Sequence, residues 1–528
     1  MLDRIRSLET LFKTETWWRG LMIAAGALFI TAIASVGAIK GKGEQVSTGE
    51  DLGDSISGLE EGLPGEGVTG TAEEIAGGTV GRGGSRSSSS TQGGTSGGAA
   101  AGSLNFGLRT QGITAKEVKV GFSYNQASCG DSAFLEAFFG AATVGDIEKS
   151  INTFARHVND NGGIGGRQYK PQFYDDGGSG CPEKSLAAAV KMADEDKVFL
   201  AVPGLDVVSD YVISKKVPTW GGRDLPESLE KYGPNGLQVL QPHDPTLEAW
   251  ASFGKHYLKS GSTPEVDLPC LIRIETGASG NWDIPEEILV AKMKKYGLTF
   301  GDIIVFKDDA STATQQSEAI ARRADEKGCQ HVFFMAGNPI GLVFMTQEAT
   351  KRGYFPTWTF TSRTALTDDD NIGKLMDPAQ WENAVGLSIR VPAGDHPMEG
   401  NCKRIYQKYN GNDGQENSVA VTLACVSVLP TSEMMNRGIK RAGDLDANSF
   451  LLGADMFRDD FYYDAHVPMQ YHFPSAKGPF KTKGFSHWTV VDWSRGESRY
   501  LFPKYPCYYK TFGPDNAGCE DLRATYKK

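Results

Sequence analysis

Cysteine is missing from the first 128 residues of this 528-residue chain, and aromatic residues are missing from residues 41–105. No cysteine precedes Cys129, so the N-terminal region has no thiol that could carry a lipid, and a lipoprotein anchor is excluded. Residues 41–105 contain no Phe, Tyr or Trp, and 18 of the 60 residues from 41 to 100 are Gly. Such a segment cannot bury enough apolar surface to offset its backbone entropy. We therefore expect a disordered linker over residues 40–112.

Sequence motifs of enzyme chemistry are missing as well. The chain contains no GxxxxGKS/T and no HExxH, which mark nucleotide and zinc sites. The closest grouping of His, formed by His466, His472 and His487, fits no zinc spacing. Asp175 and Asp176 are neighbours at the end of an expected strand and would point to opposite sides, which does not suit acid–base catalysis. We expect no metal, no cofactor and no catalytic residue, and so no enzyme.

A basic excess is also lacking. The chain has 54 Lys and Arg against 65 Asp and Glu, a net charge of −11. Nucleic-acid-binding proteins present basic surfaces to the phosphate backbone, so no nucleic acid partner is expected. The eight Cys form an even set confined to the region beyond residue 128, which favours an oxidising compartment and export from the cytoplasm.

One run near the N-terminus is long and apolar enough to cross a membrane. Residues 20–39 carry no charge, and twenty residues of helix span roughly 30 Å. Four basic residues precede the run and only two follow it closely, which places residues 1–19 in the cytoplasm and the rest outside. A cleaved signal peptide is the alternative, since Ala32, Ile33 and Ala34 form an A-x-A site. We expect a single-pass membrane anchor, because the run is longer than the apolar part of most signal peptides.

The remaining sequence alternates strand and helix patterns. Residues 118–124, 169–174 and 199–202 read as strands, and Ile147, Ile151, Phe154 and Val158 recur at helical spacing between the first two. The pattern restarts after residue 262, with strands expected over 271–275, 303–306, 331–335 and 357–360 and helices over 285–295, 313–327 and 342–352. Two successive series of this kind predict an α/β fold with two doubly wound parallel-sheet lobes.

Several motifs carry a family resemblance. The sequence NDNGGIGGR at residues 159–167, followed by YDD at 174–176, is similar to the N-terminal signature of type 1 periplasmic solute-binding proteins, the leucine/isoleucine/valine-binding family. AVPG at 201–204 and ATKRGYFPT at 349–357 resemble later segments of that family in register. WTVVDW at 488–493 resembles its late strand.

The resemblance implies a fold, a function and partners. Two lobes would be joined by a hinge of three chain crossings, with lobe 1 over residues 113–243, lobe 2 over 244–385, a return to lobe 1 over 386–455 and completion of lobe 2 over 456–528. A monomer would capture a small solute between the lobes and deliver it to an ABC permease in the membrane. The alternatives are a ligand-sensing receptor that signals through a partner and an enzyme on the same scaffold.

Candidate ligand contacts follow from the fold, because open parallel sheets bind ligands outside the carboxyl ends of their strands. The residues at those ends are Tyr124, Asn125, Gly204, Leu205, Asp206, Trp220, Gly222 and Arg223 in lobe 1, and Asn281, Trp282, Asn338, Thr361 and Ser362 in lobe 2.

The residues expected to contact the solute differ from the family pattern, which affects the class of solute. Amino-acid-binding members carry a Ser/Thr cluster after the third strand, where this chain has Leu205 and Asp206. Trp220 and Trp282, if they face each other, would offer flat apolar surface to a ring or acyl chain. The solute is therefore expected to be an amino acid, an amide or an aromatic or acyl compound. For Trp220 the other interpretation is a ring buried in the core between helix and sheet.

Four disulfides are expected among the 105 pairings that eight Cys permit. Cys129 and Cys181 follow the first two strands, and Cys270 and Cys329 open the first and third strands of lobe 2, which are neighbours in a 2-1-3 sheet order. Proximity in sequence adds the pairs Cys402–Cys425 and Cys507–Cys519.

Overall fold

The structure is a computed structural model, and the residues it describes all lie in the compact unit Gly97–Lys528. They are residues 107–124, 145–177, 182–203, 206–221, 236–237, 243–260, 269–275, 286–295, 297–307, 312–335, 339–362, 370–391, 396, 398–457, 461, 463–464, 469–472, 481–485, 487–501 and 508–510. The expected membrane anchor over 20–39 lies outside the described residues, as does the expected linker up to residue 106.

Lobe 1 is built on a five-stranded parallel sheet with the order β2-β1-β3-β4-β5. Its strands are β1 (Glu117–Tyr124), β2 (Gln168–Asp175), β3 (Leu200–Val202), β4 (Thr219–Trp220) and β5 (Gly236–Leu237). The three strands predicted from the sequence are confirmed, each within a residue or so of its expected bounds.

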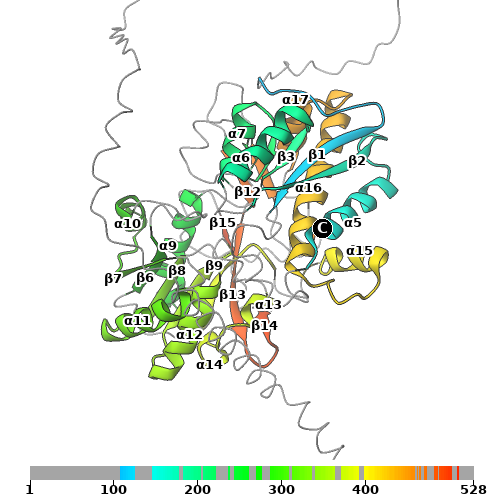
Figure 1. Ribbon diagram of the computed structural model, residues 1–528. Helices are drawn as coiled ribbons and strands as arrows, with labels where there is room; N and C mark the ends of the chain where they lie inside the picture. Colours follow the sequence, from blue (N-terminus) through cyan, green and yellow to red (C-terminus); the bar gives the residue numbers. More distant parts are fainter. Residues whose placement is uncertain are drawn as a thin grey trace, which may run out of the picture. The chain divides into compact units, whose positions relative to one another are not determined.

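Helices from two distant parts of the sequence contribute to this lobe (Figure 1). They are α5 (Ile147–Asp160), α6 (Pro182–Val190), α7 (Asp206–Ser214), α15 (Asn401–Asn410), α16 (Val419–Ala442) and α17 (Ala447–Asp455). Helix α5 begins where Asp146 accepts a hydrogen bond from the Lys149 N–H, and its periodic residues Ile151, Phe154 and Val158 are buried as predicted. Helix α6 is followed directly by a π-helix, Lys191–Glu195.

Lobe 2 has a larger, mixed sheet with the order β14-β13-β10-β9-β8-β6-β7. The parallel strands are β6 (Pro269–Ile274), β7 (Asp302–Phe306), β8 (His331–Met335), β9 (Thr357–Thr361) and β10 (Ala384–Ser388). The antiparallel strands are β13 (His487–Ser494), β14 (Arg499–Leu501) and β15 (Tyr508–Lys510), which pairs with β13. The late strand expected over 488–493 is thus present as β13, and β6 lies between β7 and β8 as the 2-1-3 order predicted.

The helices α9 (His243–Ser260), α10 (Glu286–Lys295), α11 (Ala313–Glu326), α12 (Ile340–Arg352), α13 (Asp370–Gly373) and α14 (Pro378–Trp381) belong to lobe 2 (Figure 1). Strands β11 (Met469–His472) and β12 (Lys481–Phe485) form a separate two-stranded sheet.

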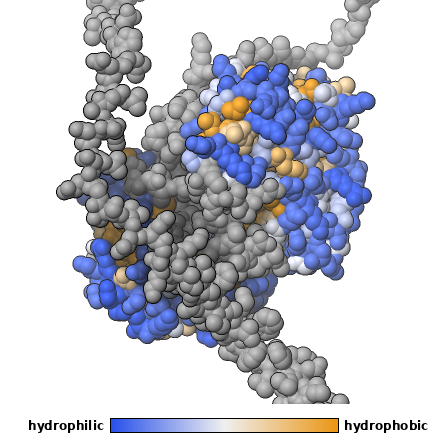
Figure 2. All heavy atoms as spheres, in the orientation of Figure 1, coloured by the Kyte–Doolittle hydropathy of each residue, from blue (hydrophilic) through white to orange (hydrophobic). Residues whose placement is uncertain are grey.

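Each of the two lobes has an apolar core of its own. One core gathers buried residues from 118–237 and from 391–463, and the other gathers them from 247–387 and from 490–500. The described surface on the face shown in Figure 2 is mostly hydrophilic, with apolar residues in small separate groups. The chain therefore leaves each lobe and returns to it, as the resemblance implied.

Helix α16 passes a length and hydropathy test for a membrane span, but it belongs to the core of lobe 1. It packs against α5 and α17, and more than half of its most apolar window is buried. Its contact with α17 depends on two glycines: a Cβ on Gly438 would lie 2.2 Å from the Ser449 carbonyl oxygen, and one on Gly453 would lie 1.8 Å from that of Met434. Cys425 joins the same helix to α15 by a disulfide.

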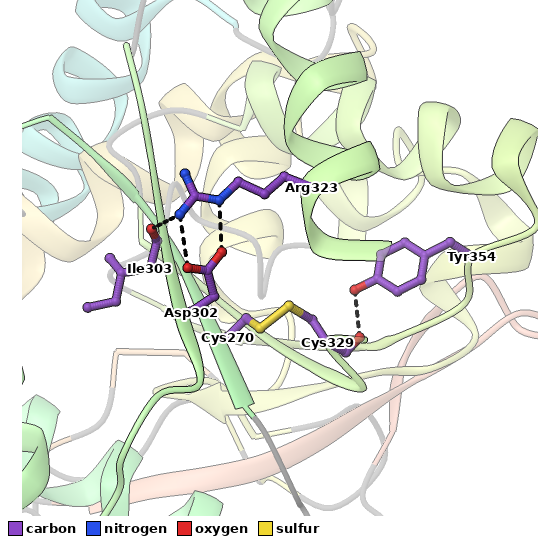
Figure 3. The surroundings of a disulfide bond; sticks show 6 residues. All are labelled: Cys270, Asp302, Ile303, Arg323, Cys329 and Tyr354. Carbon is purple, nitrogen blue, oxygen red and sulfur yellow. Dashed lines mark hydrogen bonds and ion pairs between the residues drawn. A yellow bond between two sulfur atoms is a disulfide. The ribbon is translucent and has the colours of Figure 1, made fainter. Parts of the chain in front are cut away.

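Two of the four expected disulfides are confirmed. Cys270 and Cys329 are bonded with their Cα atoms 5.6 Å apart, and Cys402 and Cys425 with theirs 5.9 Å apart. The remaining cysteines lie outside the described residues: Cys129, Cys181, Cys507 and Cys519. Figure 3 shows the Cys270–Cys329 bond close to the ion pair between Arg323 and Asp302.

A short segment before β1 is held against the amino ends of the lobe 1 strands. The N–H of Arg109 donates to the Lys216 carbonyl, and the Gln111 side chain donates to the carbonyls of Ala193 and Val198. Gly112 has a φ of +70°, and a Cβ there would lie 2.4 Å from the Phe199 backbone nitrogen. Residues 107–113 thus pack on lobe 1, although the linker was expected to continue to residue 112; we call them the entry strap.

Asp492 in β13 gives the fold a pH-dependent stability. Its Oδ1 is buried and has no hydrogen-bond partner within the described part of the chain, and burial raises the pKa of its carboxyl from 3.8 to about 6. The folded state therefore prefers the protonated form, so this contribution to stability is complete below pH 4 and is lost as the pH rises through 6.

We expect Asp492→Asn to be more stable than the parent chain by about 3 kcal/mol at pH 8 and equal to it at pH 3.5. Urea unfolding at the two pH values measures this difference. Glu326→Gln, on the exposed end of α11, is the matched control and should change neither value. A variant of Asp492 that loses stability at pH 8 would show that the carboxylate has a partner that stabilises its charge.

Candidate ligand-binding site

The carboxyl ends of the parallel strands form one edge of each sheet, which we call its carboxyl edge; the opposite edge is its amino edge. On lobe 1, Tyr124 ends β1 at this edge and is half-buried. Its hydroxyl donates to the Glu148 carboxylate in the first turn of α5, and its ring meets the Phe173 ring edge-on at 6.2 Å between centroids. Tyr124 is thus held in place at the edge where the sequence placed it.

Asp175 and Asp176, at the end of β2, have structural roles. The Asp175 carboxylate accepts from the Lys184 ammonium and from the Gly177 N–H. Asp176 is 1% exposed, and its carbonyl accepts from the Ser185 hydroxyl. These contacts tie the start of α6 to the end of β2.

Trp220 ends β4, but its side chain is 0% exposed and belongs to the lobe 1 core. The indole N–H donates to the Val426 carbonyl of α16 at 3.1 Å. A ring in this position has no surface available for stacking on a solute. The structure therefore favours the core interpretation of Trp220 over the predicted ligand contact.

On lobe 2, two buried residues with hydroxyl side chains lie at the carboxyl end of β9. Thr361 and Ser362 are 0% and 2% exposed. The Ser362 hydroxyl accepts from the Ile389 N–H at 2.8 Å, so it holds the segment that follows β10. Both residues lie at the predicted edge, and the Ser362 hydroxyl is hydrogen-bonded to the backbone there.

The segment after β10 is one of the chain crossings from lobe 2 to lobe 1. Ile389 packs against both cores. The Thr489 hydroxyl, on β13, lies 3.0 Å from the Ser388 carbonyl oxygen and 2.7 Å from that of Arg390. The Thr489 hydroxyl therefore fixes the backbone at the start of this crossing. Sequence reasoning missed this contact because Thr489 is about 100 residues away from Ser388 and Arg390 in sequence.

Arg273 is a second residue that the sequence interpretation missed. It lies one residue before the end of β6, is 2% exposed, and donates from Nε to the Ile274 carbonyl at 2.9 Å. A buried guanidinium is costly unless it is paired, and such residues concentrate at functional sites. A charged residue within an otherwise apolar strand, CLIRI at 270–274, is the signal that would have identified it.

The structure leaves the other predicted contacts untested. Asp206 is the first residue of α7, directly after β3 and its turn, and its side chain lies outside the description. The positions wholly outside the described residues are Asn125, Gly204, Leu205, Gly222, Arg223, Asn281, Trp282 and Asn338. No group of three or more His, Cys, Asp or Glu placed to hold a metal occurs among the described residues.

Solved structures share this architecture. A branched-chain amino acid ABC transporter protein from Thermus thermophilus, solved with valine, is 13% identical with a TM-score of 0.56, over 75% of this chain and 97% of that one. A fatty acid ABC transporter substrate-binding protein from Thermomonospora curvata is 15% identical with a TM-score of 0.53, over 78% and 96%. At such identities the likeness establishes the fold.

The sequence itself supplies the assignment. No curated protein matches the chain. A family model described as periplasmic binding protein matches residues 139–461, which is more than half of the chain and includes parts of both lobes. The resemblance to type 1 periplasmic solute-binding proteins is thereby confirmed, and the chain belongs to the periplasmic binding protein family.

Proposed function

We propose that this protein captures a small solute between its two lobes and delivers it to an ABC importer. The observation that carries the proposal is the pair of sheets, one parallel and one with five parallel strands and an antiparallel extension. Each has a carboxyl edge suited to ligand binding, and chain crossings such as the one at Ile389 join the two lobes. Hinged lobes of this kind close around ligands. Family membership supports a binding role, and we infer that the chain is not an enzyme.

The location follows from the sequence. We propose that residues 20–39 anchor the chain in the membrane and that residues 41–106 form a flexible tether, so that the folded lobes work outside the cytoplasm as a monomer. The confirmed disulfides Cys270–Cys329 and Cys402–Cys425 support an oxidising compartment. An ABC permease in the same membrane would receive the solute.

The first turn of α7 bears on the solute class. A helix N-terminus attracts anions, but the first residue of this helix in the sequence is itself acidic, Asp206. The next residue, Val207, is 41% exposed. A solute that places an amide, an ammonium or an apolar group here fits better than one that places a carboxylate here. We propose a solute with an apolar body, a range that includes the valine and fatty acid named for the two structural relatives.

Ligand-induced closure is the test of this proposal. We expect mass spectrometry of the purified full chain to reveal a retained small molecule, or a panel of branched-chain amino acids, amides, aromatic acids and fatty acids to yield one binder. At 100 times its Kd that binder should add about 2.7 kcal/mol to stability, seen as a higher Tm. Small-angle scattering should show a decrease in the radius of gyration. A binder that raises the Tm without compaction would contradict capture between the lobes.

A further inference from the structure

A pocket opens at the amino edge of the lobe 2 sheet, at the end opposite to the proposed solute site. Its volume is about 420 Å³, within the range of small-molecule sites. Two consecutive helix-to-strand turns form it: residues 325–331 lead from α11 into β8, and residues 354–357 lead from α12 into β9. The disulfide Cys270–Cys329 and the Tyr354 hydroxyl, which donates to the Cys329 carbonyl at 2.6 Å, fix the two turns (Figure 3).

Three polar groups that line this pocket have unused hydrogen-bonding capacity. His331 is 2% exposed, and its Nδ1 has no partner. The Gln330 side chain makes no hydrogen bond within the described part of the chain, where only its backbone carbonyl is used, by the Thr357 N–H. Asp325 has one loose ion pair, 3.8 Å from its Oδ2 to Arg352 Nε, which leaves Oδ1 available. Asp325 and Gln330 are exposed, whereas His331 is buried. Buried polar groups are normally satisfied, so the unpartnered Nδ1 of His331 at this pocket calls for a ligand.

The apolar part of the pocket is aromatic. Phe355 is 52% exposed, the largest exposed fraction among the large apolar side chains described, and it lines the pocket next to the buried Pro356. An exposed aromatic face attracts a cation or another ring.

The charge at the pocket selects among ligands. Asp325 accepts hydrogen bonds only and repels a carboxylate, while its surface pair with Arg352 is worth little. Burial lowers the pKa of His331, so its imidazole is neutral near pH 7 and does not oppose a cation. Phe355 and Asp325 together therefore suit a positive charge attached to a flat apolar group.

We propose that this pocket is a second ligand site, distinct from the solute site, and that it takes a small aromatic amine. The ammonium binds Asp325, the ring packs on Phe355, and Gln330 and His331 complete the polar contacts. The proposal does not depend on transport, since every residue it uses belongs to the amino edge of lobe 2.

Phenethylamine is the probe, titrated into the full chain by saturation-transfer NMR and calorimetry. We expect saturable binding with a Kd of about 1–5 mM, and at least about tenfold weaker binding of 3-phenylpropionate, which has the same ring with a carboxylate. Asp325→Asn and Phe355→Ala should each weaken phenethylamine about fivefold or more. Both side chains are exposed enough for the variants to fold, which their Tm values check.

Matched controls locate the binding. Glu326→Gln removes the neighbouring charge of α11, and Leu186→Ala removes an exposed apolar side chain of lobe 1; both should bind phenethylamine like the parent. Three results would overturn the proposal: no saturable binding up to about 20 mM, equal binding of the carboxylate, or binding unchanged in both pocket variants, which would place the amine elsewhere.

Discussion

Trp220→Ala should lower the free energy of unfolding by about 3–5 kcal/mol. The side chain is fully buried in the lobe 1 core, so its removal leaves a cavity that the sheet and α16 cannot fill. It also removes the hydrogen bond from the indole N–H to the Val426 carbonyl. Urea unfolding followed by circular dichroism measures the loss, and the Tm should fall by many degrees.

Trp220→Phe is the matched control for this variant. It keeps a ring in the core but loses the N–H donor, and we expect a loss of about 1–2 kcal/mol. Solute affinity, measured on the protein that remains folded, distinguishes the two interpretations of Trp220. An unchanged Tm with affinity reduced 10- to 100-fold would mean that the ring stacks on the solute after all.

Removal of the Cys270–Cys329 disulfide should be the second large effect. The bond closes a loop with a sequence separation of 59, and a chain-entropy model gives about 4 kcal/mol for a loop of this length. Both sulfur-bearing residues are 1% exposed, so the double Ala variant also loses packing. We expect the unfolding midpoint of lobe 2 to fall substantially in urea.

The second disulfide provides the comparison. Cys402–Cys425 closes a separation of only 23, so its double Ala variant should lose about 3 kcal/mol, and the loss should fall on lobe 1. A larger loss from Cys402 and Cys425 than from Cys270 and Cys329 would contradict the dependence on loop length.

Strands and helices that carry a strong period were predictable from the sequence. The apolar residues of α5 recur at helical spacing, which predicts a helix with one buried face, and the short apolar runs of β6 and β8 predict buried strands. The Cys270–Cys329 pairing then followed from the expected order of the strands in the sheet. The antiparallel direction of β13 carries no local signal, because it depends on where the chain re-enters lobe 2.

The candidate site was harder to predict, because residues at a strand end face either the solute or the core. The sequence around Trp220 predicts a binding turn. In the structure the ring is buried, and its N–H donates to a carbonyl of α16, some 200 residues away in sequence. Thr489 was missed for the same reason: its role comes from a tertiary contact that no short motif encodes. Arg273 was missed although its charge within an apolar strand is a signal in the sequence.

The entry strap has a consequence for how the lobes meet a membrane permease. The chain enters lobe 1 at the amino edge of its sheet, and the eight residues of β1 separate that edge from the carboxyl edge by roughly 26 Å. A short connection would therefore hold the solute-binding edge pointing away from the bilayer. The predicted tether of about 65 residues has a root-mean-square reach of roughly 45 Å, so the lobes are free to turn over and present that edge to the membrane.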